Sequence, residues 1–233
     1  GGLLVEDPRA PFSRRADPEA LATQIVAALG TFDVVLADPG DLERADAVAD
    51  MGAVDRYAVP ARARALDGAD DLLGRLRDAL PPGTLLLVVS VTPPADEWRL
   101  TPLVAAGAGV VPGYLHSPST RRLGLVSLTD LAPTILGALG APVPTELPGA
   151  VLRYHPAPRA DLARLARLDR DSAWREARWL AVTTVFIVLQ VGLWFVTGAA
   201  LAGRLAWMRR SWLRLVALAV AAFPLAALLL RAV

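Results

Sequence analysis

The chain of 233 residues contains no cysteine and only two histidines. Without cysteine the protein has no disulfide, no thiol nucleophile and no thiolate metal site. Lysine is also absent, so all 24 basic residues are arginine, and with 23 acidic residues the formal net charge is +1. Because acids and bases are mixed along the sequence rather than gathered into a basic face, we expect no nucleic-acid partner.

Charge is missing from one long stretch near the C-terminus. Trp179 to Leu201 is a run of 23 residues without an ionisable side chain. As a helix it measures about 34 Å, enough to cross a hydrocarbon core of about 30 Å. A second apolar run, Leu215 to Leu230, follows. We predict a transmembrane helical hairpin with spans at 179–201 and 212–230; the alternative is a pair of core helices, which normally keep a polar face.

The rest of the chain divides by composition. Residues 1–141 have the mixed charge, proline and glycine content of a soluble domain, and the start at Gly1-Gly2 leads us to expect a fragment of a longer chain. Residues 142–160 form a proline-rich linker. Residues 161–178 are rich in arginine and predict a juxtamembrane helix, either lying among lipid headgroups or simply solvated.

The soluble part alternates predicted strands and helices, which indicates an α/β fold. Helices are predicted from Asp17-Pro18 to Gly30, over about 61–80 and over 131–139. Predicted strands cover 32–37, 84–91, 101–106 and 123–128. Thr84 to Val91 is continuously apolar, as in a strand buried on both faces. We therefore predict a layered, mostly parallel sheet with helices on both faces.

Three stretches in order resemble the alkaline phosphatase superfamily. They are the helix from Leu66 to Leu80 with its Pro-Pro-Gly-Thr exit, the strand ending at Ser90, and the run from Gly124 to Pro144. The resemblance covers roughly residues 30–150 and implies the C-terminal portion of that fold. Its most specific part, beginning at Thr129-Asp130, corresponds to a closing helix and carries no chemistry.

The catalytic parts of that family's pattern are missing. The resemblance implies an Asp-His metal pair directly after Ser90, where this chain has Val91, Thr92 and Pro93, and a further histidine where it has Thr101. We therefore predict no catalytic residue, no bound metal and no cofactor. Asp38 and Asp41, which follow a predicted strand, are weak metal candidates, and a simple Asp-Pro-Gly-Asp turn accounts for them equally well.

One loop combines hydroxyl groups with arginine, a combination that suits phosphate or sulfate. The candidate anion-binding residues are His116, Ser117, Ser119, Thr120, Arg121 and Arg122. The alternative is an ordinary polar loop before an edge strand.

These observations favour a membrane-anchored, non-catalytic alkaline phosphatase-like domain that acts as a binding or assembly module at a bacterial cell envelope. Its expected partners are the lipid bilayer and envelope proteins or anionic ligands. We expect a multi-pass protein of the cell membrane with an extracytoplasmic domain. Two alternatives stay open, namely a metal-dependent phosphoryl or sulfuryl transferase or hydrolase, and an accessory domain of a polytopic transporter.

Overall fold

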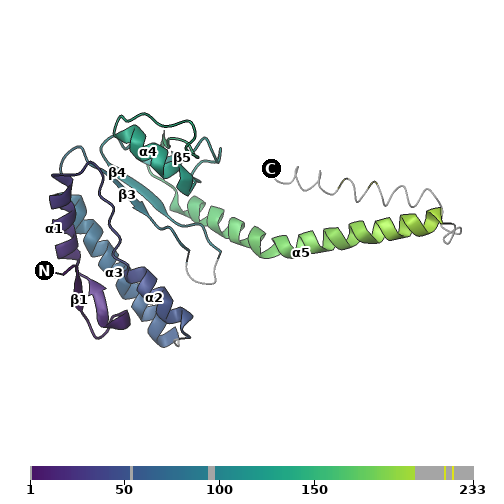
Figure 1. Cartoon of the computed structure of the whole chain (residues 1–233), viewed down its shortest axis with the longest axis horizontal. Helices are drawn as coiled ribbons and strands as arrows, with labels where there is room; N and C mark the ends of the chain where they lie inside the picture. The colour runs from purple at the N-terminus through teal and green to yellow at the C-terminus, as the bar shows by residue number, and fades with distance from the viewer. Residues whose placement is uncertain (1, 53–54, 94–97, 203–217, 219–221, 223–233) are drawn as a thin grey trace. The chain divides into compact units, whose positions relative to one another are not determined.

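The structure is a computed structural model that describes residues 2–52, 55–93, 98–202, 218 and 222. The chain divides into two compact units, residues 1–169 and 170–233. The first contains all the strands described below and most of the helices, and the second contains most of the long C-terminal helix (Figure 1).

Three helices form the N-terminal part of the first unit: α1 (Pro18–Leu29), α2 (Asp41–Asp50) and α3 (Asp55–Ala79). The first and third confirm predicted helices, whereas α2 was not predicted. Leu21 and Ala22 of α1 pack against Leu72 and Leu76 of α3. Because these residues recur at helical spacing, each helix presents one apolar side to the other.

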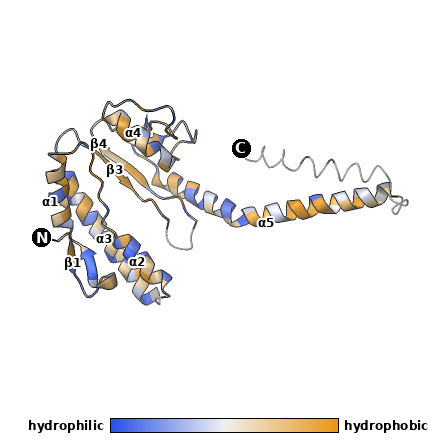
Figure 2. Ribbon diagram, viewed as in Figure 1, coloured by the Kyte–Doolittle hydropathy of each residue, from blue (hydrophilic) through white to orange (hydrophobic). Residues whose placement is uncertain are grey.

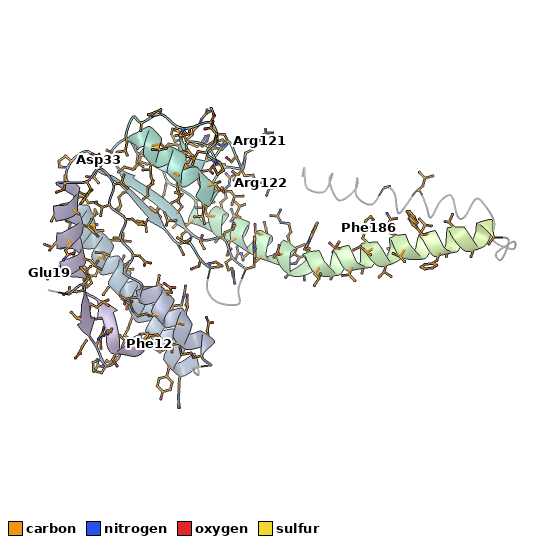
Figure 3. All side chains as sticks on the ribbon, in the orientation of Figure 1. Phe12, Glu19, Asp33, Arg121, Arg122 and Phe186 are labelled. Carbon is orange, nitrogen blue, oxygen red and sulfur yellow. The ribbon has the colours of Figure 1, made fainter. Side chains whose placement is uncertain are left out.

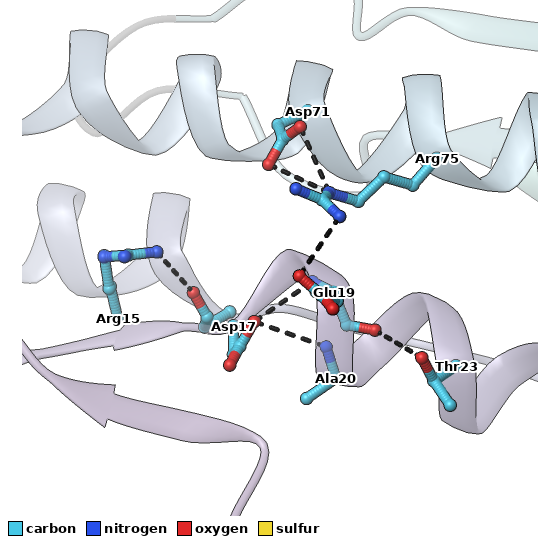
Figure 4. A network of polar contacts seen from close by, with 8 residues as sticks. Arg15, Asp17, Glu19, Ala20, Thr23, Asp71 and Arg75 are labelled. Atoms are coloured by element: carbon cyan, nitrogen blue, oxygen red, sulfur yellow. Dashed lines mark hydrogen bonds and ion pairs between the residues drawn. The ribbon is translucent and has the colours of Figure 1, made fainter.

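Polar contacts define how α1 begins and how it lies against α3 (Figure 4). The Asp17 carboxylate caps α1 by accepting hydrogen bonds from the backbone N–H groups of Glu19 and Ala20, at 3.0 and 3.3 Å. Arg75 of α3 pairs with Asp71 on its own helix and with Glu19 on α1. These side chains are largely exposed, so the ion pairs contribute less than the apolar contact beside them.

The strands of the first unit form two-stranded antiparallel sheets, which makes the predicted layered parallel sheet wrong. The pairs are β1 (Leu4–Glu6) with β2 (Arg14–Ala16), β3 (Leu85–Val89) with β4 (Leu103–Gly107), and β5 (Gly113–His116) with β6 (Arg153–Pro156). A parallel pair requires a crossover, usually a helix. The described residues between β3 and β4 contain no helix, and β4 returns alongside β3 in the opposite direction.

Two predicted strands are also wrong. Residues 32–37 form no strand, and the 123–128 segment contributes a single bridge between Leu123 and His116. Both segments have apolar sequences typical of strands, but neither forms a hydrogen-bonded ladder with another described strand. The short strand β6 lies within the segment 142–160, which was predicted as a proline-rich linker.

Two helices lie in the C-terminal half of the described chain. A 3-10 turn, η2 (Leu128–Asp130), leads into α4 (Leu131–Ala138), which confirms the predicted helix there. The helix α5 (Leu162–Leu201) contains both the predicted juxtamembrane helix and the first predicted span. Figure 2 shows that its later turns are predominantly hydrophobic.

Within the described residues, one helix, at 162–199, is long and apolar enough to cross a membrane. The second predicted span, 212–230, lies outside the described residues except for Leu218 and Ala222. The multi-pass arrangement therefore stays a prediction.

We expect the contact between α1 and α3 to stabilise the first unit. Leu76→Ala removes a side chain that is 5% exposed, and we expect the free energy of unfolding to fall by about 2–5 kcal/mol. Leu66→Ala on the same helix is the control, because Leu66 is 50% exposed, and it should lower stability by under about 1 kcal/mol. Urea unfolding of the detergent-solubilised chain measures both. Equal effects would contradict this account of the core.

Candidate functional site

A buried carboxylate, Asp130, lies at the end of η2, where the chain enters α4. The side chain is 0% exposed, and so is that of Ser117, which follows β5. Thr134, one turn further along α4, is also buried. A buried charge is stable only when it is fully hydrogen-bonded, so the partners of Asp130 determine what this cluster does.

Three donors form hydrogen bonds with the carboxylate. Ser119 Oγ donates to Oδ1 at 2.8 Å, and the backbone N–H of Ala150 donates to the same oxygen at 2.9 Å. The backbone N–H of Ser127 donates to Oδ2 at 2.8 Å. The buried Ser117 hydroxyl also favours the charged form of the carboxylate. Asp130 therefore connects three segments of the first unit: the loop after β5, the turn before α4, and the segment leading to β6.

These contacts determine the charge state of Asp130. Burial alone raises the pKa of the carboxyl group, because it disfavours the charged form. The hydrogen bonds from Ser117, Ser127, Ala150 and Ser119 favour the charged form, and the net result is a pKa below the ordinary value. Asp130 is therefore a carboxylate, with its lone pairs directed at protein donors.

A second set of contacts joins the segment before β6 to α4. Thr134 Oγ1 donates to the Asp130 carbonyl at 2.6 Å and accepts from the Leu152 backbone N–H at 2.9 Å. Gly149 approaches the same turn closely, and a Cβ at this position would lie 2.3 Å from the Thr129 carbonyl oxygen. With φ at +98°, this position requires glycine. Hydrogen bonds to Thr134 and the close approach of Gly149 thus hold the segment before β6 against the start of α4.

The structure brings the predicted anion-binding residues together in one loop, but it gives their hydroxyl groups other partners. The Ser119 hydroxyl donates to Asp130, and the Thr120 hydroxyl donates to the Leu125 carbonyl. The Ser117 hydroxyl is buried and accepts from the Ser119 N–H. These donors are occupied, and the carboxylate beside them repels anions. His116 belongs to β5, where it pairs with Arg153 of β6.

The two arginines of the loop are less constrained. Arg121 is exposed and has a positive φ of 55°, and Arg122 is half-buried (Figure 3). No ion pair links either guanidinium group to a described residue. An anion at this loop would therefore depend on the two arginines and not on the hydroxyls.

The two weak metal candidates support the turn before α2. Asp38 Oδ1 accepts a hydrogen bond from the Gly40 N–H at 2.8 Å, which is an Asx turn. Asp41 accepts from the Ala16 N–H at 3.0 Å and pairs with Arg44. Among the described residues, no three His, Asp or Glu side chains are grouped so as to hold a metal ion.

A small hollow lies between the end of β3, the start of β4 and η2. Its lining includes Ser90, Thr101, Ser127 and Leu131. At about 50 Å³ it holds one or two water molecules, far less than the 300–1,000 Å³ of typical ligand pockets. The hollow is therefore smaller than a typical small-molecule substrate requires.

Sequence reasoning identified Thr129-Asp130 as the cap of a helix but missed the burial of Asp130 and its long-range partners. A local signal was present, since Ser127 and Asp130 have the spacing of a capping box, which the structure contains. The hydrogen bond from the Ala150 N–H joins residues 20 apart in the sequence, so no local sequence pattern indicates it.

Comparison of the chain with protein-family models, curated proteins and solved structures finds no match. The resemblance to the alkaline phosphatase superfamily gains no support from these comparisons and stays a prediction from the quoted motifs. The function is therefore argued from the chain's own residues.

The depressed pKa of Asp130 predicts a specific acid sensitivity. Because the folded-state pKa lies below the unfolded value, the stabilisation is fully present above about pH 4 and is lost as the pH falls through the folded pKa. Asp130→Asn should lower the free energy of unfolding at pH 7 by about 3 kcal/mol, because an amide has one accepting oxygen and cannot accept hydrogen bonds at both positions as the carboxylate does. It should also flatten the acid limb of the stability profile.

The matched control is Asp67→Asn, which alters an exposed carboxylate on α3. Chemical unfolding followed by circular dichroism between pH 3 and 7 measures all three proteins. An unchanged acid limb in Asp130→Asn would show that the carboxylate does not stabilise the fold.

Proposed function

We propose that the chain is a membrane-anchored, non-catalytic module that binds an extended segment of a partner protein at the cell envelope. The observation that carries this proposal is the β3–β4 sheet, which has two strands and pairs with no other strand among the described residues. An isolated two-stranded sheet is marginally stable in water. It gains stability when a further strand joins it.

The register of the sheet identifies its free backbone groups. At the two ends of the sheet, the Thr84 carbonyl accepts from the Ala108 N–H, and the Ser90 N–H donates to the Pro102 carbonyl. Alternate residues of an antiparallel strand point their backbone groups to opposite edges. The N–H and C=O groups of Leu85, Leu87 and Val89 therefore point away from β4, and no described residue pairs with them.

The side chains of β3 favour an apolar occupant. All five residues, Leu85 to Val89, are apolar, and all are half-buried rather than buried. A partner strand with alternating apolar side chains would form hydrogen bonds with the edge backbone groups and pack its side chains beside those of β3. Edges of this kind normally carry charge or proline as protection against pairing, and β3 has neither.

A second apolar segment of the first unit is also uncovered. Phe32, Val34 and Leu36 lie in the unpaired stretch where a strand was predicted, and their exposed fractions are 62%, 50% and 95%. Exposed apolar side chains this close in sequence are typical of interaction surfaces. They support an assembly role for the same unit.

Anchoring is supported by α5, whose residues 179–201 form an uninterrupted uncharged run, mostly apolar, at the end of a long helix. A span of this length retains the first unit at the membrane surface, where partners are confined to a thin layer. The extracytoplasmic side is proposed from the sequence resemblance alone.

Proline at the free edge of β3 tests the binding proposal. Leu87→Pro removes one outward N–H without removing a β3–β4 hydrogen bond, and we expect it to weaken partner binding at least about fivefold. Leu87→Val is the matched control, because it keeps the N–H and an apolar side chain. The measurement is the yield of a protein adduct from a photo-crosslinking residue at Val91, just after β3, in native membranes.

The proposal requires an adduct in the control and its loss in Leu87→Pro, with both variants folded by circular dichroism. Equal yields from the two variants, or no adduct from either, would show that this edge binds no partner strand.

The non-catalytic part of the proposal has its own test. We expect metal analysis of the purified full-length protein by mass spectrometry to find less than about 0.1 zinc or manganese per chain, because no ligand cluster is found among the described residues. We also expect no phosphodiesterase turnover in the same sample. Stoichiometric metal with turnover would overturn this part and favour the metal-dependent enzyme.

A further inference from the structure

The segment of α5 just before the apolar run carries a row of side chains suited to lipid headgroups. Arg170, Trp174 and Arg178 follow one another at intervals of four residues, so they lie on one side of the helix. All three are exposed. The Arg178 guanidinium carbon lies 4.3 Å from the centre of the Trp174 ring, a cation–π contact.

The acidic residues near this row do not neutralise its positive charge. Glu176 lies two residues from both Trp174 and Arg178, and therefore on another side of the helix. Asp171 is four residues from Arg175, whose Nε donates to the Asp171 carbonyl at 3.0 Å. Among the described residues, no ion pair is formed by Arg170 or Arg178.

The position of the row along the helix matches the headgroup layer. The apolar run starts at Trp179, so at about 1.5 Å per residue Arg178 lies about 1.5 Å outside it and Trp174 about 7.5 Å outside. The headgroup layer on each side of a bilayer is about 5–8 Å thick. Arg170, about 13.5 Å out, reaches this layer with its long side chain.

We propose that Arg170, Trp174 and Arg178 form a binding site for an anionic phospholipid, with the guanidinium groups on the phosphate and the indole ring at the interface. This inference rests on the proposed membrane anchoring. A guanidinium group matches two phosphate oxygens at once, and a lipid such as phosphatidylglycerol carries no cation of its own that competes with arginine. The bilayer is the occupant because the same helix enters it one residue later.

The test uses the full chain in phosphatidylcholine vesicles with a trace of spin-labelled lipid. Electron paramagnetic resonance measures the fraction of labelled lipid that the protein immobilises. We expect labelled phosphatidylglycerol to associate about two to five times more strongly than labelled phosphatidylcholine, given about fivefold per arginine near a membrane surface. In 1 M salt, where the Debye length is about 3 Å, the preference should shrink.

The variant Arg170→Gln/Arg178→Gln should reduce the preference to about one. The matched control, Arg14→Gln/Arg56→Gln, removes the same charge from two exposed positions of the first unit and should keep the preference. Retention of the preference in the first variant, or its loss in the control, would overturn the assignment to these residues.

Flotation of the same vesicles at alkaline pH separates this inference from the anchoring on which it rests. A chain that floats with the vesicles but immobilises both lipids equally would overturn the lipid site and leave the anchor intact. A chain that does not float would overturn the anchor, and the lipid site with it.

Discussion

The carboxylate of Asp130 is the constraint on which the C-terminal part of the first unit depends. It accepts hydrogen bonds from the loop after β5, from the turn before α4 and from the backbone near β6. These segments have few large buried side chains, and a charge in their midst would be destabilising if any of the donors were missing. Because the donors are in place, α4 has a defined start and β6 lies beside β5.

The same cluster explains why hydroxyl groups in a loop are weak evidence for a ligand site. Serine and threonine between β5 and α4 resemble an anion-binding loop in sequence, but an internal carboxylate and a backbone carbonyl take up their donors. The apolar surface of β3 and of residues 32–36 is the opposite case. The outer edge of β3 pairs with no described strand, and Phe32, Val34 and Leu36 are exposed, so these are the surfaces that an assembly function would use.

In the proposed anchoring, two features of α5 act together. The uncharged run that begins at Trp179 is proposed to lie in lipid, and the residues just before it are proposed to contact headgroups. Arginine and tryptophan suit that boundary because each joins an apolar body to a polar group. The cation–π contact between Arg178 and Trp174 holds the two side chains together on one side of the helix.

The sequence by itself determined α1, α3, α4 and the long apolar helix, since caps, helical spacing and missing charge are local signals read within one or two turns. It determined too that residues 84–91 would contain a strand. Only the tertiary structure decided that β3 pairs antiparallel with β4, that residues 32–37 form no strand, and that Asp130 is buried. The physical reason is that strand pairing and buried hydrogen bonds join residues far apart in the chain. The local sequence around one of these residues does not indicate which distant residue is its partner.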